Sequence, residues 1–283
     1  MAAEQAAPAA GRGVTERLRS GASRAFPRSP LDLLVQFAII AAAYYAWRYA
    51  RGAVDGSTTE SVRNALDLVS IEGSLGLFFE HSVQHWATAV GWPLDFANWM
   101  YLNAHFKGSL LALGAIYFLR NDSFGFVRNM LLCAMAISLL GYGLFPTAPP
   151  RFAPGLDIRD TVSAVTGNPP IPAHPDALFN PYAAVPSMHI GFSLMWGVSL
   201  ALLFRPWWLR GLFLSYPLVM TYVVVATGNH FWIDGSFGAL AAALAAGCAL
   251  ALSRLRPERW SFHPRLGGEP VGARRPEVEA APA

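Results

Sequence analysis

Three ionisable side chains stand at the entrances of two long apolar stretches. His189 opens the first stretch, and His230 and Asp234 open the second. An ionisable residue at the mouth of a membrane helix costs free energy unless it is paired or used in function. We therefore interpret these three residues as one catalytic site, and the rest of the chain as the scaffold that brings them together.

The spacing of His230 and Asp234 fits a working pair. Residues four apart on a helix face the same way, so the carboxylate can accept a hydrogen bond from the imidazole. That bond fixes the tautomer and leaves the other ring nitrogen free to attack an electrophile. The same spacing also fits a structural pair that stabilises a helix end. Taken alone, the spacing does not distinguish the catalytic from the structural interpretation.

His189 shifts the balance towards catalysis. One apolar stretch runs away from His189 and the next returns, which places His230 at the membrane level of His189. Two histidines at matching depth, one with a carboxylate partner, can act as nucleophile and general acid. The alternative is a lone buried His189 that bonds a backbone carbonyl.

The surroundings predicted for both histidines favour an anion. We expect each to lie in the first turn of a helix, where the backbone N–H groups lack partners and the dipole is positive. Ser187 can cap its helix or donate to a ligand oxygen. Arg151, at the end of an earlier apolar stretch, could hold two phosphate oxygens, or it is an ordinary interfacial arginine.

The composition is that of a membrane protein. Of 283 residues, 54% are apolar and only 14% are charged. The net charge of +3 and the lack of a basic patch interleaved with aromatics argue against a nucleic-acid partner. Cys133 and Cys248 lie inside apolar runs, which predicts buried thiols and not a disulfide framework.

The fold class predicted is an all-α integral membrane protein, an antiparallel bundle of six transmembrane helices. A helix needs about 20 apolar residues to cross a bilayer. The first run, after a long leader, favours an uncleaved signal anchor. The six predicted spans are 31–50, 94–119, 126–145, 185–204, 209–226 and 231–252.

The segments around the spans are assigned by composition. We predict a disordered cytoplasmic leader over residues 1–29 and a disordered cytoplasmic tail over 254–283. Residues 30–253 form the predicted membrane catalytic domain. Residues 58–86 are too polar to span and predict interfacial helices before the second span. Residues 146–186 hold ten prolines without a helical or strand period, which indicates a long outer loop that forms a lid or wall over the site, or else a dispensable insertion.

The arginines predict the orientation. With the amino terminus inside, fifteen arginines fall in cytoplasmic segments and five in outer segments. Positive charge is enriched on the cytoplasmic side. We therefore expect a multi-pass plasma membrane protein with both termini cytoplasmic and the catalytic site on the outer face.

Two short motifs carry a family resemblance. The stretches Pro186-Ser187-Met188-His189 and His230-Phe231-Trp232-Ile233-Asp234 resemble the P-S-x-H and H-x-x-x-D motifs of the type 2 phosphatidic acid phosphatase superfamily. Residues 145–152 (FPTAPPRF), 180–189 and the Asn229-His230 step resemble its inositol phosphorylceramide synthase branch.

The chain also departs from that superfamily. Its first motif, K-x6-R-P, is absent, and Arg151 is a substitute without a motif match. The Ser-Arg pair expected shortly before the third-motif histidine falls on Val223 and Val224. A phosphate must then be held by other groups. These departures make a broad-specificity phosphatase a less favoured interpretation than a phosphotransferase.

The resemblance implies a mechanism. His230 attacks the phosphorus of a lipid phosphate or phosphodiester, Asp234 orients His230, and His189 protonates the departing oxygen. Water, or an alcohol such as inositol, then releases the phosphoryl group from the phosphohistidine. Phosphate-binding roles fall to Arg151, Ser187 and Asn229. The implied partners are a phospholipid or other lipid-phosphate substrate, the membrane and an inositol or alcohol acceptor, with no cofactor and no metal.

Other interpretations stay open at this point. The protein could be a simple phosphatidate or polyprenyl (pyro)phosphate phosphatase. Metal-dependent hydrolysis would use His189, His230 and Asp234 as ligands, although no further strong ligand lies nearby in the sequence. A non-enzymatic lipid transporter or lipid-binding protein is disfavoured, because the polar residues gather at one face and do not trace a path across the membrane.

Overall fold

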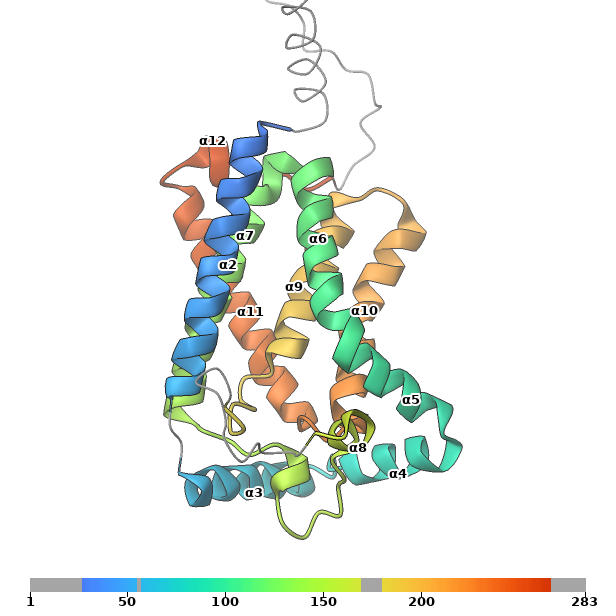
Figure 1. The fold of residues 1–283 in the computed structure, drawn as a ribbon. Coiled ribbons are helices and arrows are strands. Elements are labelled where there is room, and N and C mark those ends of the chain that lie inside the picture. The colour runs from blue at the N-terminus through green and yellow to red at the C-terminus, as the bar shows by residue number, and fades with distance from the viewer. Residues whose placement is uncertain (1–26, 55–56, 169–179, 266–283) are drawn as a thin grey trace, which may run out of the picture.

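The fold is helical throughout the part of the chain that the computed structural model describes, residues 27–54, 57–168 and 180–265, and no strand occurs there (Figure 1). The element η1 is a π-helix and η2 a 3-10 helix. The elements, in chain order, are α2 (Pro30–Ala53), α3 (Thr58–Ser74), α4 (Glu80–Val90), α5 (Trp92–Trp99), η1 (Met100–Ala104), α6 (His105–Leu119), α7 (Asn121–Leu144), η2 (Pro150–Phe152), α8 (Thr161–Thr166), α9 (Met188–Leu203), α10 (Trp207–Ala226), α11 (Trp232–Ser253) and α12 (Pro257–Trp260).

The long helices run side by side along the axis of the bundle. Helix α9 packs against α10 and α11, α11 also packs against α7, and α2 and α6 flank this centre (Figure 1). The core is built from apolar side chains that are almost fully buried, including Ile116, Val127, Ala134, Trp196 and Ala245. On α2, by contrast, Leu31 and Phe37 are 70% and 63% exposed, as lipid-facing side chains are.

Four of the described helices are long and apolar enough to cross a membrane, namely α2, α7, α10 and α11. They indicate a multi-pass membrane protein. Helix α9 is apolar but has only 16 residues, and α6 has 15, although α5, η1 and α6 follow one another without a gap from 92 to 119. The full count of six spans therefore stays a prediction.

Two polar helices lie across one end of the bundle. Helices α3 and α4 run crosswise to the bundle axis below the starts of α9 and α11 (Figure 1). Their buried faces carry Glu72, Glu80 and Gln84, which point functional groups at the bundle end. The place predicted for this segment at the membrane interface stays a prediction.

The long connection after α7 contains helical turns, contrary to the sequence expectation. Besides η2, its described part holds α8, which Asp160 caps by accepting a hydrogen bond from the Ser163 amide at 3.0 Å. The helix ends at Gly167, whose φ of +69° is a left-handed conformation that glycine adopts readily. A helix of six residues is too short to produce a visible hydrophobic period, which explains the difference.

Part of the segment predicted as a disordered tail packs on the bundle. Residues 254–265 include α12, and Phe262 packs on Phe126 with ring centroids 5.1 Å apart. Arg120, only 4% exposed, donates to the backbone carbonyls of Leu203 and His263. The rest of the tail, 266–283, and most of the leader, 1–26, lie outside the described residues.

Helices α9 and α11 approach each other closely where both begin. The amide of Ser187 donates to the carbonyl of Asp234 at 3.0 Å. A side chain at Gly238 would collide with the Ser187 carbonyl, so glycine is required there. Small residues allow such contacts between membrane helices. The two segments that carry the histidines are therefore joined directly through their backbones.

This contact yields a stability prediction. Gly238→Val forces α11 away from Ser187, and overpacking of this kind costs about 1–3 kcal/mol. We expect a lower melting temperature in detergent together with reduced catalytic activity. Gly247→Val on the same helix is the control, because no atom lies near its added Cβ. Equal melting temperatures for the two variants would contradict the prediction.

Candidate active site

The two histidines meet at one end of the bundle. Nδ1 of His189 lies 3.4 Å from Nε2 of His230, and their ring centroids are 5.5 Å apart at 61°. His189 belongs to the first turn of α9, and His230 lies between α10 and α11. The out-and-back path of α9 and α10 thus returns the chain to the level of His189, as the sequence predicts.

His230 is not in the first turn of α11, contrary to the sequence expectation. The N-cap of α11 is Phe231, and His230 precedes it. A turn at Gly228 ends α10, and the amide of His230 donates to the Val224 carbonyl at 3.2 Å. The pairing with Asp234 survives this shift, because Oδ2 of Asp234 lies 3.3 Å from Nδ1 of His230.

The environment of His230 keeps its ring neutral. The side chain is 6% exposed, and burial together with the positive charge of Arg151 lowers its pKa to about 3. Near pH 7 the imidazole therefore carries no charge. With Nδ1 facing Asp234, the Nε2 lone pair remains for attack on an electrophile.

Two aromatic rings hold His189 from its other side. The ring of Tyr101 stacks on His189 at 4.8 Å and 28°, and His105 lies 5.0 Å away. Nδ1 of His105 lies 3.0 Å from the hydroxyl oxygen of Tyr216 on α10. Tyr101 sits in the π-helix η1, an irregularity that often marks functional sites.

Three carboxylates occupy the start of α11. The amide of Phe231 donates to Asp234 at 3.0 Å, that of Trp232 to Glu80 at 2.9 Å, and that of Ile233 to Glu72 at 3.1 Å. We call Glu72, Glu80 and Asp234 the carboxylate collar; all three are fully buried.

The collar corrects a sequence expectation. The sequence predicts that the N-terminal amides of α11 bind an anion of the substrate, and that prediction is wrong for this helix. Carboxylates are favoured at the positive end of a helix dipole, and the protein supplies its own. Burial and the nearby Glu80 raise the pKa of Glu72 to about 8, so Glu72 is protonated at neutral pH.

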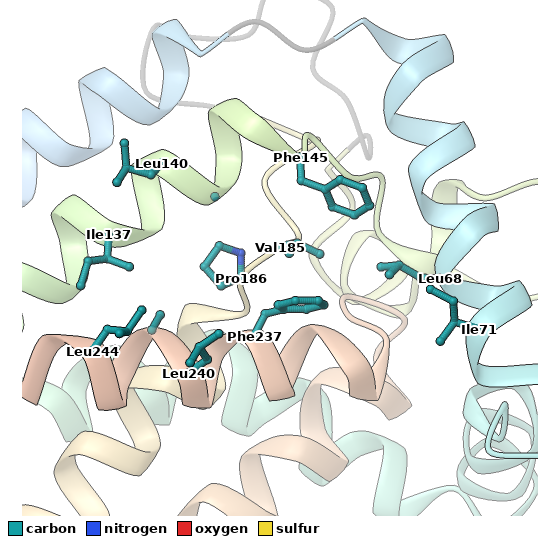
Figure 2. A pocket seen from close by; sticks show the side chains of 12 residues that line it. Leu68, Ile71, Ile137, Leu140, Phe145, Val185, Pro186, Phe237, Leu240 and Leu244 are labelled. Carbon is teal, nitrogen blue, oxygen red and sulfur yellow. The ribbon is translucent and has the colours of Figure 1, made fainter. Parts of the chain in front are cut away.

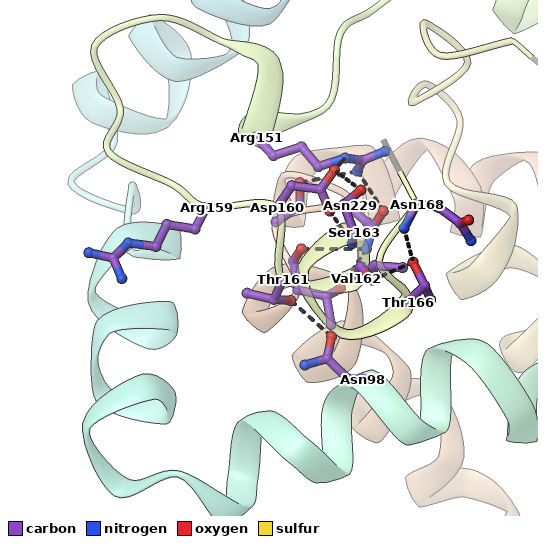
Figure 3. Close-up of polar contacts among 12 residues, drawn as sticks. Asn98, Arg151, Arg159, Asp160, Thr161, Val162, Ser163, Thr166, Asn168 and Asn229 are labelled. Carbon is purple, nitrogen blue, oxygen red and sulfur yellow. Dashed lines mark hydrogen bonds and ion pairs between the residues drawn. The ribbon is translucent and has the colours of Figure 1, made fainter. Parts of the chain in front are cut away.

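Arg151 reaches the site from the loop after α7. Its guanidinium contacts Asp160 at 3.2 Å and donates to the side-chain oxygen of Asn229, the residue before His230 (Figure 3). The backbone amide of Arg151 also donates to the Gly228 carbonyl at 3.2 Å. The arginine is therefore at the site, and protein groups already engage it.

The other two predicted phosphate ligands, Asn229 and Ser187, differ in the hydrogen bonds that they already form with the protein. The side-chain amide of Asn229 donates to the Thr227 hydroxyl at 2.7 Å and its oxygen accepts from Arg151, so Asn229 positions the arginine. The hydroxyl of Ser187 is buried, does not cap α9 and has no hydrogen-bond partner among the described residues. Among the described residues its hydrogen-bonding capacity is therefore unused.

The sequence matches a known family over most of its length. The sequence model of the PAP2 superfamily matches residues 66–262. The chain belongs to the PAP2 superfamily. No curated protein and no solved structure matches it significantly. Members of the superfamily are in general phosphatases, which supports an enzyme that acts on lipid phosphates in a membrane.

The loop after α7 forms a wall of the site in this PAP2 superfamily chain. The hydroxyl of Thr161 donates to Asn98 on α5 at 2.9 Å (Figure 3). Gln84 on α4 accepts from the amide of Arg159 at 2.7 Å and donates to its carbonyl at 3.0 Å. These bonds tie the loop to both crosswise and bundle helices, which argues against a dispensable insertion.

The departures from the superfamily motifs have a structural counterpart. Val223 and Val224 stand where a Ser-Arg pair is expected, and both are fully buried in an apolar cluster. Those positions offer no polar side chain, whereas Arg151 brings a guanidinium beside Asn229. Within the described residues, no group of three or more His, Cys, Asp or Glu side chains could hold a metal ion, so the geometry gives the metal hypothesis no support.

The collar generates a kinetic prediction. Glu80→Ala removes the acceptor of the Trp232 amide, and losing such a partner costs about 1–3 kcal/mol. The start of α11 then shifts, so kcat on phosphatidate should fall roughly tenfold or more while KM changes little. Glu80→Gln keeps an acceptor oxygen and should recover part of kcat. The exposed Asp67→Ala on α3 is the control, and an equal loss there would refute the prediction.

Glu72 generates a pH prediction. Its pKa is raised from 4.5 to about 8, so the folded chain keeps a proton that the unfolded chain releases over this range. The stability that Glu72 contributes is full below the lower value and is lost as the pH rises through the upper one. The melting temperature of Glu72→Gln relative to wild type should therefore increase with pH between about 4.5 and 8. A flat difference would contradict this.

Proposed function

We propose that this protein is a lipid phosphatase or phosphotransferase that works through a phosphohistidine on a lipid phosphate or phosphodiester. The observation that carries the proposal is the continuous contact from Asp234 through His230 to His189. A carboxylate-backed neutral imidazole beside a second imidazole supplies a nucleophile and a general acid in one buried place.

In the proposed first step, Nε2 of His230 attacks phosphorus and a P–N bond forms as the bond to the leaving oxygen breaks. Asp234 accepts the hydrogen bond from Nδ1–H and stabilises the positive charge that develops on the ring. A protonated His189 gives its proton to the leaving oxygen. The two ring nitrogens, 3.4 Å apart, must separate to admit the reacting atoms.

The non-bridging oxygens need positive partners in this step. Arg151 is placed to supply a guanidinium, which can bind two phosphate oxygens at once. Ser187 supplies a hydroxyl that has no partner among the described residues. Asn229 and Asp160 hold the arginine ready on the site. Groups preorganised in this way stabilise charge that develops in the transition state.

An apolar cavity beside the site supports a lipid substrate. It has a volume of about 450 Å³ and lies between α3, α7 and α11, where Leu140, Phe237 and Leu244 line it (Figure 2). Pro186 forms part of its wall, one residue before Ser187. A hydrocarbon chain in this cavity would leave the attached phosphate close to the catalytic groups.

In the second step, an acceptor oxygen attacks the phosphorus of the phosphohistidine and a P–O bond forms as the P–N bond breaks; His189 takes the proton of the acceptor, and His230 leaves as a neutral imidazole. The absent first motif and the resemblance at 145–152 favour an alcohol such as inositol, as in the inositol phosphorylceramide synthase branch. Water as the acceptor would make the protein a phosphatidate or polyprenyl (pyro)phosphate phosphatase. The arginine distribution supports a plasma membrane location, cytoplasmic termini and a site on the outer face.

The assigned roles are tested by substitution. His230→Ala removes the nucleophile and should abolish nearly all activity, whereas His189→Ala should lose roughly 10²–10⁴-fold, the range of general acid catalysis. Release of product from labelled phospholipid measures both. The exposed His85→Ala serves as the matched control. Near-normal turnover by the His230 variant would overturn the assignment.

The acceptor and the competing functions are separated by product analysis. Purified protein is incubated with labelled phospholipids, with and without inositol, and the products are identified. A phosphoenzyme trapped after a brief incubation, or inhibition by vanadate, supports catalysis; lipid movement without either result supports a transporter. Products that ignore inositol would favour hydrolysis over transfer.

A further inference from the structure

A second cavity, of about 300 Å³, lies at the end of the bundle away from the two histidines. Its lining residues come from the beginnings of α2 and α7 and from α12. These three segments lie together at one end of the bundle (Figure 1). Four arginines line it, facing one acidic residue, Asp32; they are Arg28, Arg128, Arg256 and Arg259. The lining therefore carries a large excess of positive charge.

The single carboxylate does not neutralise these arginines. Asp32 accepts hydrogen bonds from the Tyr117 hydroxyl at 2.9 Å and from Gln36 at 3.3 Å, while Arg28 is 3.9 Å away. Its charge is thus shared among several groups, of which only one is an arginine within ion-pair distance.

The remaining arginines have neutral partners or none among the described residues. Arg128, 9% exposed, donates to the side-chain oxygens of Gln36 and Asn129. The guanidinium of Arg256 lies over the Trp260 ring at 5.7 Å. Arg259 is exposed and forms no ion pair within the described part of the chain. A structural cluster would pair such charges with acids, whereas the described residues place no acidic group within ion-pair distance of these three.

We propose that this cavity binds the phosphate of an anionic phospholipid in the leaflet opposite the catalytic site. Guanidinium groups bind phosphate oxygens in pairs. The cavity lies where candidate spans α2 and α7 begin, and the end of a span is where lipid headgroups are expected. Basic pockets between membrane helices are recognised sites for anionic headgroups. Ile39, Phe124 and Leu132 line the same cavity and provide an apolar surface for the lipid body.

This site is separate from the proposed reaction. Its residues belong to the far ends of α2 and α7 and to α12, and neither His189 nor His230 lines it. A lipid held there would link α2, α7 and α12 across the membrane surface. The orientation predicted from the arginines makes this the cytoplasmic leaflet, which carries the anionic lipids.

The test uses the full chain in nanodiscs of zwitterionic lipid with and without phosphatidylglycerol. Native mass spectrometry counts retained phosphatidylglycerol, and hydrogen exchange follows residues 256–265. Wild type should retain one more phosphatidylglycerol than the double variant Arg256→Gln/Arg259→Gln, and its α12 should be protected by that lipid. Affinity in the double variant should fall roughly tenfold or more, as loss of charged hydrogen bonds implies.

Controls distinguish binding in the cavity from a general effect of surface charge. Arg205→Gln, an exposed arginine at the same end outside the cavity, should behave as wild type. An equal loss in Arg205→Gln, or an unchanged lipid count in the double variant, would overturn the proposal. Protection of α12 by inorganic phosphate alone, to the same extent, would assign the site to free phosphate and also overturn it. Arg128→Gln provides a second loss-of-binding variant. A lipid in the catalytic site adds equally to all counts.

Discussion

The site depends on the hydrogen bonds formed by the buried backbone amides at the start of α11. A helix begins with amides that have no partners inside the helix, and burying them unpaired is costly. Here α3, α4 and α11 itself each supply one carboxylate, from Glu72, Glu80 and Asp234. These bonds fix the direction in which α11 leaves the loop. Because His230 stands immediately before that start, they also fix the position of His230, the proposed nucleophile, and explain why two polar helices lie across the bundle end.

The same arrangement places the acidic and the basic groups of the site on different segments of the chain. The first amides of α11 already donate to the collar, so they are not free to bind a phosphate. The positive group comes instead from Arg151 on the long loop, which Asp160 and Asn229 hold against the turn before His230. Loop, crosswise helices and bundle therefore form one unit. This accounts for a PAP2 superfamily site without the usual first motif.

The sequence predicts the parts of this site that depend on local spacing and chain direction. An apolar stretch out and another back is enough to bring His189 and His230 together. The hydrogen bonds of the collar cannot be predicted in this way, because Glu72 and Glu80 accept from amides that are more than 150 positions away in the sequence. Tyr101 and His105 lie inside the region that resembles the superfamily, but the short motifs assign them no role, and only the structure places their rings against His189. The short helix α8 lacks a period to reveal it, and the start of α11 lies two residues beyond His230.

The two imidazoles and Arg151 already have partners within the protein, and this constrains how a substrate enters. The two imidazoles contact each other at 3.4 Å, and Arg151 is held by Asp160 and Asn229. A phosphate must replace these contacts with its own. Its binding therefore gains less free energy than binding to the same groups would if they had no partners in the protein. The binding energy of a remote part of the substrate can drive such an opening and be recovered in the transition state. The apolar cavity between α7 and α11 is where a lipid tail would supply it. A soluble phosphate ester lacks that tail, so the proposed function predicts a preference for lipid substrates over soluble phosphate esters.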